Sequence, residues 1–109
     1  MIATYLMWVK LSLPKRSFEE VYGPGYNVTE YKEQEWMDSP IAPTEKNIYV
    51  HSCVFRDCIS TENGGAFCCN SYTNELLLIE QSSFISCRTS NRKGGGIYVS
   101  NRGKCVLNR

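Results

Sequence analysis

Hydrophobic and polar positions between residues 48 and 99 run through nearly the same pattern twice. The first copy is IYVHSCVFRDCISTENGGAFCC (residues 48–69), and the second is LLIEQSSFISCRTSNRKGGGIYV (residues 77–99). Phe55 corresponds to Phe84 at an offset of 29 residues, and a glycine pair follows in each copy. A period of this size is typical of repeat architectures, in which each supersecondary unit packs on the next.

Alternation within each copy predicts short β-strands. Ile48 and Val50 share one face of the first strand, and Tyr49 and His51 share the other. Another strand follows the glycine pair, with Phe67 on its inner face. The glycine pairs suit sharp corners that need positive φ or close backbone approach. Each unit therefore holds two or three short strands and has no room for a helix.

A unit this short cannot bury its apolar faces alone. If each unit coils once, equivalent strands stack in parallel at a spacing of about 4.8 Å. The expected stacks are Val50 on Ile79, Phe55 on Phe84, and Phe67 on Ile97. We therefore predict an all-β fold, a short right-handed parallel β-helix of about two coils and the start of a third. A pair of similar antiparallel hairpins is the alternative interpretation.

The chain before the repeats has a different amino-acid composition. All four prolines lie between residues 14 and 46 and divide this stretch into short pieces. Ser17 is placed to cap a brief helical turn, and residues 28–36 suit either a short strand or a helix. We predict an irregular N-terminal segment over residues 1–46 and β-helix repeats over residues 47–109. Aromatic side chains of the N-terminal segment are expected to cover the first coil: Trp8, Phe18 and Trp36.

Residues 1–13 superficially resemble a secretory signal, but the start carries no basic residue and Lys10 interrupts the apolar run. The segment is too short to span a bilayer. Its alternating residues are mostly apolar on both faces, which favours a buried strand.

Six cysteines suggest a disulfide framework, but the stacking of equivalent residues in the two copies offers another explanation. Cys58 and Cys87 should lie one above the other as free thiols, because buried cysteine behaves as a small hydrophobe and parallel side chains keep their Cβ atoms too far apart for a bridge. A zinc site is the alternative, with ligands from His51, Cys53, Cys58 and Cys68 or Cys69. A cysteine nucleophile with His51 as base lacks an orienting third group. The remaining cysteine is Cys105.

The net charge is +1, from 12 basic and 11 acidic residues, which implies no nucleic-acid partner. Asp57 corresponds to Ser86, so the two copies stack no acidic pair for glycoside hydrolysis. Calcium-binding and phosphate-loop motifs do not occur in the sequence. The nearest basic group lies in or beside turns and is interpreted as solvated charge: Arg88, Arg92, Lys93, Arg102 and Lys104.

Phe-x-x-Cys, a polar turn and Gly-Gly with a following apolar residue recur at Phe55–Phe67 and at Phe84–Ile97. This pattern resembles the repeats of polymorphic outer-membrane proteins, which carry Phe-x-x-Asn and Gly-Gly-Ala-Ile, and Cys-rich surface proteins of unicellular parasites. The resemblance covers about half of the chain, residues 48–99. It implies a pectin-lyase-like β-helix with a surface or adhesive role.

We therefore expect a non-catalytic module, at the cell surface or secreted, with a structural or adhesive role. It is expected to have no catalytic, cofactor-binding or metal-binding residues. The rigid scaffold would present turn side chains to a cell-surface protein or glycan ligand. The alternative is a carbohydrate-active β-helix enzyme whose catalytic coils lie elsewhere.

The last residues begin a further unit, because residues 104–107 align with residues 75–78. We expect a third coil that starts and is not completed, with an open edge above Val106 and Leu107. This predicts a fragment of a longer surface protein, or self-association through the open C-terminal coil.

Overall fold

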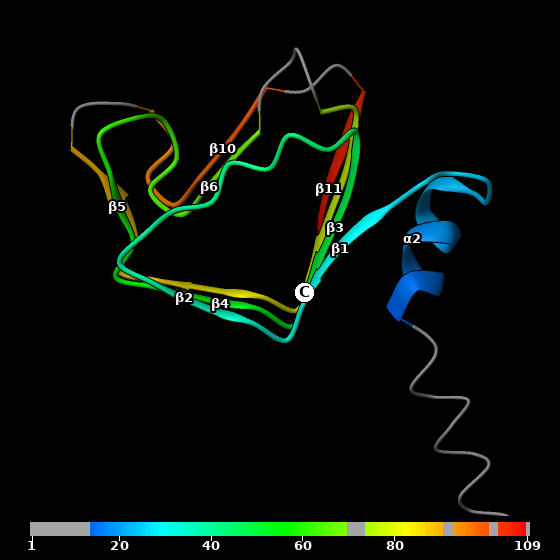
Figure 1. Ribbon diagram of the computed structural model, residues 1–109, viewed down its shortest axis with the longest axis horizontal. Coiled ribbons are helices and arrows are strands. Elements are labelled where there is room, and N and C mark those ends of the chain that lie inside the picture. Colours follow the sequence, from blue (N-terminus) through cyan, green and yellow to red (C-terminus); the bar gives the residue numbers. More distant parts are fainter. Residues whose placement is uncertain (1–13, 70–73, 91–92, 101–102, 109) are drawn as a thin grey trace, which may run out of the picture.

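A computed structural model describes residues 14–69, 74–90, 93–100 and 103–108. Over these residues the chain is mostly strand, with one helix, α2 (Pro14–Tyr22). The all-β class predicted from the sequence is confirmed. The strands, drawn in Figure 1, are β1 (Thr29–Lys32), β2 (Glu35–Met37), β3 (Asn47–His51), β4 (Val54–Arg56), β5 (Ile59–Ser60), β6 (Phe67–Cys69), β7 (Leu76–Glu80), β8 (Ser83–Ile85), β9 (Arg88–Thr89), β10 (Ile97–Val99) and β11 (Lys104–Asn108).

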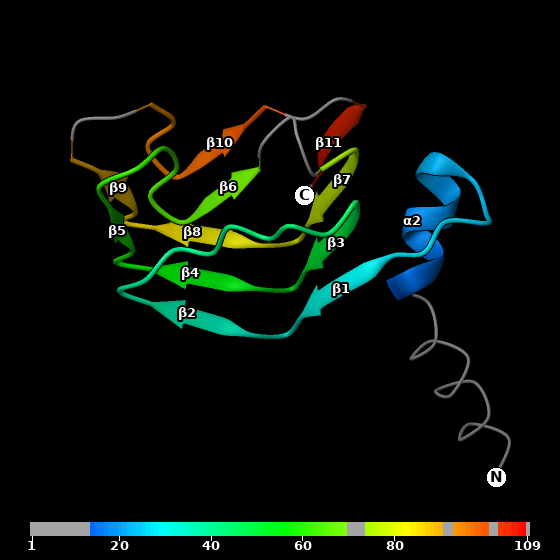
Figure 2. The same cartoon turned by 45° about the horizontal axis from the view of Figure 1, so that its top comes forward.

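These strands form several short parallel sheets. The sheet orders are β1-β3-β7-β11, β2-β4-β8, β5-β9 and β6-β10. Strands that follow one another along the chain enter different sheets, and the chain returns to the first sheet at β3, β7 and β11 (Figure 2). We call the stretch between two such returns a layer. The alternative of antiparallel hairpins is wrong, because every strand pair in the described residues is parallel.

The predicted stacks between the two copies form in the predicted register. Phe55 pairs with Phe84, and their rings lie 4.6 Å apart with an angle of only 2° between their planes. Phe67 likewise lies opposite Ile97 in the parallel pairing of β6 with β10. Phe55 and Phe67 are fully buried, whereas Phe84 and Ile97 are half-buried. The second copy therefore lies at one end of the described core rather than in its middle.

Two strands, β1 and β2, extend the sheets below the first copy. Strand β1 lies in the stretch 28–36, for which the sequence left a strand and a helix open, but its pairing with the repeats was not predicted. Thr29 pairs with Ile48, and Trp36 pairs with Phe55, both at an offset of 19 residues. The Trp36 ring stacks on Phe55 at 4.7 Å, so the predicted cover of the first copy by Trp36 is confirmed. The division into residues 1–46 and 47–109 stays a prediction. The strand predicted over residues 1–13, with Trp8, lies outside the described residues.

The helix α2 covers the outer face of the β1-β3-β7-β11 sheet (Figure 2). Its fully buried Phe18 packs with Tyr49 and Leu78 in a cluster separate from the main core. The Tyr22 hydroxyl donates to the carbonyl oxygen of Leu77 at 2.6 Å, and its partial burial raises the pKa of Tyr22 to about 12. The described part of the chain contains no helix with the length and apolar character needed to cross a membrane.

The glycine pairs occupy the corners expected of them. Gly64 and Gly94 have φ of 77° and 73°, in the left-handed region that favours glycine. A Cβ on Gly65 would lie 2.4 Å from the Arg88 amide nitrogen and from the Gly95 carbonyl oxygen. The first glycine of each pair therefore supplies the turn, and Gly65 allows neighbouring layers to approach.

The predicted alignment of the last strand is wrong by one residue. Lys104 pairs with Leu76 and Cys105 with Leu77, whereas the sequence alignment placed Lys104 on Glu75. A shift of one residue moves every side chain to the other face of a strand. In the observed register, Val106 packs against the cluster under α2. In the predicted register, Cys105, which is exposed in the structure, would face that cluster instead.

Candidate functional site

Two columns of exposed corner residues follow the layers. Glu33, Ser52 and Gln81 occupy the corners after β1, β3 and β7, with φ between 47° and 56°. The corners after β2, β4 and β8 likewise have positive φ and hold Asp38, Asp57 and Ser86. The left-handed conformation is tolerated best by short polar residues. We call the second set the Asp57 column.

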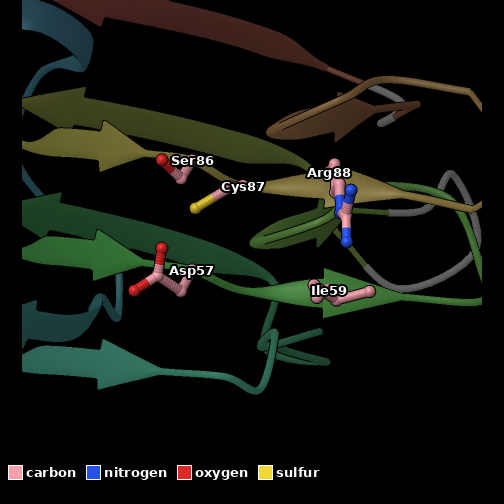
Figure 3. A pocket seen from close by; sticks show the side chains of 5 residues that line it. All are labelled: Asp57, Ile59, Ser86, Cys87 and Arg88. Atoms are coloured by element: carbon pink, nitrogen blue, oxygen red, sulfur yellow. The ribbon is translucent and has the colours of Figure 1, made fainter.

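The Asp57 column borders a cavity of about 300 Å³ on the surface. Figure 3 shows Ser86 above Asp57 on one side, with Arg88 above Ile59 on the other. The Cys87 sulfur lies between these two sides. The cavity spans two layers. Asp57 and Ile59 belong to the layer of β4 and β5, and the other three residues belong to the layer of β8 and β9: Ser86, Cys87 and Arg88.

The cavity walls carry opposite charges. The Asp57 carboxylate and the Arg88 guanidinium stand on opposite sides, and Ile59 adds an apolar surface that is 47 % exposed. Arg88 was interpreted from the sequence as a solvated turn charge, and the structure places it in the cavity wall. Such walls suit a ligand that carries both hydroxyl groups and an anionic group. Of the other basic residues considered, Arg92 and Arg102 lie outside the described residues.

The Asp57 column contains an acidic pair that the sequence comparison missed. Asp57 and Ser86 occupy equivalent corners, as expected, because Arg56 pairs with Ile85. Asp38 is the equivalent of Asp57 one layer below, because Met37 pairs with Arg56. Adjacent layers are about 4.8 Å apart. The column therefore presents two neighbouring exposed carboxylates, which comparison of the two copies alone could not reveal.

Behind the column, Cys58 and Cys87 are the stacked free thiols that the sequence predicted. They sit between the paired residues Arg56↔Ile85 and Ile59↔Arg88. The Cys58 thiol is fully buried and donates to the Ser39 carbonyl oxygen at 3.4 Å. Burial and the neighbouring Cys87 thiol raise the pKa of Cys58 to about 11.

His51 is held by one carboxylate and an aromatic ring rather than by cysteines. Its Nε2 lies 2.8 Å from Glu30 Oε2, and its ring stacks on Tyr49 at 4.4 Å. The Tyr49 hydroxyl donates to Glu80 Oε1 at 2.7 Å, and burial with this hydrogen bond raises the pKa of Tyr49. Sequence analysis missed this group, because Glu30 lies in the stretch that was not aligned to the repeats.

The zinc alternative is not assembled in the structure. Its candidate ligands were His51, Cys53, Cys58 and either Cys68 or Cys69. No three histidine, cysteine, aspartate or glutamate side chains in the described ranges gather closely enough to hold a metal ion. His51 is buried beside Glu30 and Tyr49, outside the main core. Cys53 is in the main core and donates to the Tyr31 carbonyl oxygen at 3.3 Å. His51 is therefore not placed to act as base for Cys53.

A second cavity, of about 230 Å³, lies at the C-terminal end of the core. Its walls are mostly apolar and include Ile79, Phe84, Ile97 and Leu107, with Ser82 and Asn108 at its polar edge. Leu107 is 59 % exposed. This end therefore leaves core side chains accessible.

No protein-family description, curated protein or solved structure matches this chain. Its function must therefore be argued from the Asp57 column, the cavity beside it and the arrangement of the sheets.

Proposed function

We propose that this chain is a right-handed parallel β-helix that acts as a non-catalytic module, at the cell surface or secreted. The observation that carries this proposal is the repeated return of the chain to one parallel sheet at β3, β7 and β11. Crossovers between parallel strands of one sheet are right-handed in nearly all proteins. The Phe-x-x-Cys and Gly-Gly motifs, which resemble the repeats of polymorphic outer-membrane proteins, support the same fold and a surface role.

The module would work by holding polar corner side chains at fixed spacing along one flank. Asp38, Asp57 and Ser86 project from successive layers whose strands are fixed by parallel ladders. A ligand bound there loses little free energy to ordering of the protein, because the corner backbone is already held. The chemistry of the cavity beside Asp57 favours a cell-surface glycan or a polar protein surface as the ligand.

Binding to immobilised cell-surface glycans and proteins tests this role. Asp57→Ala and Arg88→Ala each remove a charged hydrogen-bonding group, worth about 1.5–3 kcal/mol in such contacts. We expect each substitution to weaken binding about tenfold or more. Gln81→Ala is the matched control, because Gln81 occupies the other corner column and is also exposed. A chain that binds nothing, or binds equally well without Asp57 and Arg88, would contradict the proposal.

A carbohydrate-active enzyme is the second candidate, and the Asp38 and Asp57 pair favours it. Retaining glycosidases use two carboxyl groups about 5–5.5 Å apart, which is close to the spacing of adjacent layers. Release of reducing sugar from polysaccharides, abolished by Asp57→Asn, would establish this activity. Absence of release together with glycan binding would leave the non-catalytic role as the better account.

A further inference from the structure

The thiols of Cys58 and Cys87 lie one above the other in neighbouring layers, between the paired residues Arg56↔Ile85 and Ile59↔Arg88. Cys87 Sγ–H donates to the Phe55 carbonyl oxygen at 3.3 Å, and Phe55 belongs to the layer of Cys58. Two free thiols stacked in neighbouring layers differ from a single buried cysteine, because each is the other's neighbour along the stack.

The two thiols differ in access to solvent. Cys58 is fully buried, whereas Cys87 is half-buried and lines the cavity of about 300 Å³. Figure 3 shows the Cys87 sulfur in the gap between Ser86 and Arg88. A small reagent that enters the cavity therefore meets Cys87 first, and Cys58 stays sheltered behind it. This is the arrangement in which an accessible thiol reacts and a neighbouring thiol resolves the product.

We propose that Cys87 and Cys58 form an oxidation site for hydrogen peroxide, which opens into the cavity beside Asp57 and does not require the proposed binding role. In the first step the Cys87 sulfur attacks one oxygen of hydrogen peroxide and the O–O bond breaks. Cys87 becomes a sulfenic acid, and the other peroxide oxygen takes the thiol proton and leaves as water. In the second step the Cys58 sulfur attacks the sulfenic sulfur, an S–S bond forms, and a second water leaves. Both thiol protons end in water, and the peroxide is reduced by two electrons.

Closing the bridge requires a small local movement. Neighbouring layers place Cα atoms about 4.8 Å apart, within the range that disulfides span, but the Cβ atoms must approach to about 3.8 Å. Asp57 and Ser86 precede the two cysteines and are corner residues outside the strands. The movement therefore falls on the corners and leaves β4 and β8 in register. The bridge joins residues 29 positions apart and ties the second copy to the first.

Peroxide treatment of the reduced full-length chain, followed by peptide mass spectrometry, tests the site. We expect a Cys58–Cys87 cross-link in the wild-type chain, together with a melting temperature that rises by a few degrees. In Cys58→Ser the sulfenic acid at Cys87 has no partner, so a dimedone adduct should accumulate there. In Cys87→Ser neither the cross-link nor an adduct at Cys58 should form.

Cys68 supplies the matched control. It is also half-buried, but its neighbour in the next layer is Tyr98 rather than a cysteine. Cys68→Ser should therefore leave the Cys58–Cys87 cross-link unchanged. The circular dichroism of each variant shows whether it folds, and Cys58→Val replaces Cys58→Ser if the serine is not tolerated. The proposal is overturned if Cys87 of a folded chain stays unmodified while Cys68 reacts, or if Cys58 is bridged to a different cysteine.

Discussion

At the scale of single residues, the aromatic column decides how much each core position contributes. Trp36, Phe55 and Phe84 stack in succession at 4.7 and 4.6 Å. Phe55 has a ring on each side and is fully buried, whereas Phe84 is half-buried. An aromatic ring stabilises the fold most where both of its faces are covered, because burial and ring stacking then act on each face.

Truncation to alanine should therefore lower the free energy of unfolding by different amounts at different residues of this column. Phe55→Ala is expected to lower the free energy of unfolding by about 3–5 kcal/mol, because it leaves a cavity in the core. Phe84→Ala should cost less, since part of its ring already contacts solvent. Urea denaturation of the two variants measures the difference. An equal loss for both would mean that the C-terminal end of the core is covered in solution.

Alkaline pH should destabilise the fold through its buried tyrosines. The pKa of Tyr22 and that of Tyr31 are each raised to about 12, mainly by burial. An unfolded chain releases these protons near pH 10, while the folded chain retains them to about pH 12. Stability from this source is therefore complete below about pH 10 and is lost as the pH rises toward 12.

Urea midpoints between about pH 8 and 11.5 measure this loss. Tyr22→Phe should make the alkaline decline less steep, because one titrating group is removed. Tyr26→Phe is the control, because Tyr26 is 45 % exposed. A decline that is equally steep in the wild type and in Tyr22→Phe would show that the Tyr22 hydroxyl is not sheltered in the fold.

Residue-level chemistry was only partly predictable from the sequence. The Cys58 and Cys87 stack followed from their equal positions in two copies. The cavity that joins Asp57 to Arg88 did not, because it depends on how far each corner projects from its layer. The contact of His51 with Glu30 was likewise hidden, since the two residues belong to strands whose pairing had not been recognised.

At the scale of elements, the sequence revealed the repeats where the offset between paired strands is close to 29 residues and missed the pairing where it is much shorter. Paired residues of the two copies lie 29 positions apart at β4 and β8 and 30 apart at β6 and β10. Strand β1 precedes β3 by only 19, so the likeness of EWMDS (residues 35–39) to VFRDC (residues 54–58) was overlooked. The last strand is offset by 28, which explains the one-residue error in its alignment. Packing of Val106 under α2, a contact between distant residues, selects the observed register.

The close approach of layers at the glycine corner predicts a contrast between neighbouring glycines. Gly65→Ala should destabilise the fold strongly, because its Cβ would meet backbone atoms of Arg88 and Gly95 at 2.4 Å. Backbone atoms cannot move aside as the end of a flexible side chain can. Gly95→Ala is the control, because a Cβ there meets no atom within 4 Å. Thermal unfolding of both variants checks this, and equal melting temperatures would contradict the tight layer contact.

At the scale of the whole molecule, the stacked sheets end in two unlike surfaces. One end carries the half-buried Trp36 and the exposed Met37 of β2. The other end carries the apolar cavity around Phe84 and Ile97, with Leu107 beside it. All ladders are parallel, so both ends present strands of the same direction. One copy can therefore stack on the next head to tail, which is a heterologous contact that continues the sheets.

Self-association through these ends is the prediction that follows. Sedimentation velocity should show species larger than the monomer, with a fraction that increases with protein concentration. Leu107→Glu should shift the chain toward monomer, because it places a charge at the apolar cavity. Val21→Glu is the control, since Val21 is exposed on α2 rather than at an end of the sheets. A chain that stays monomeric at high concentration and melts in one cooperative step would contradict this prediction. That result would mean that the apolar end is closed in solution by the chain itself.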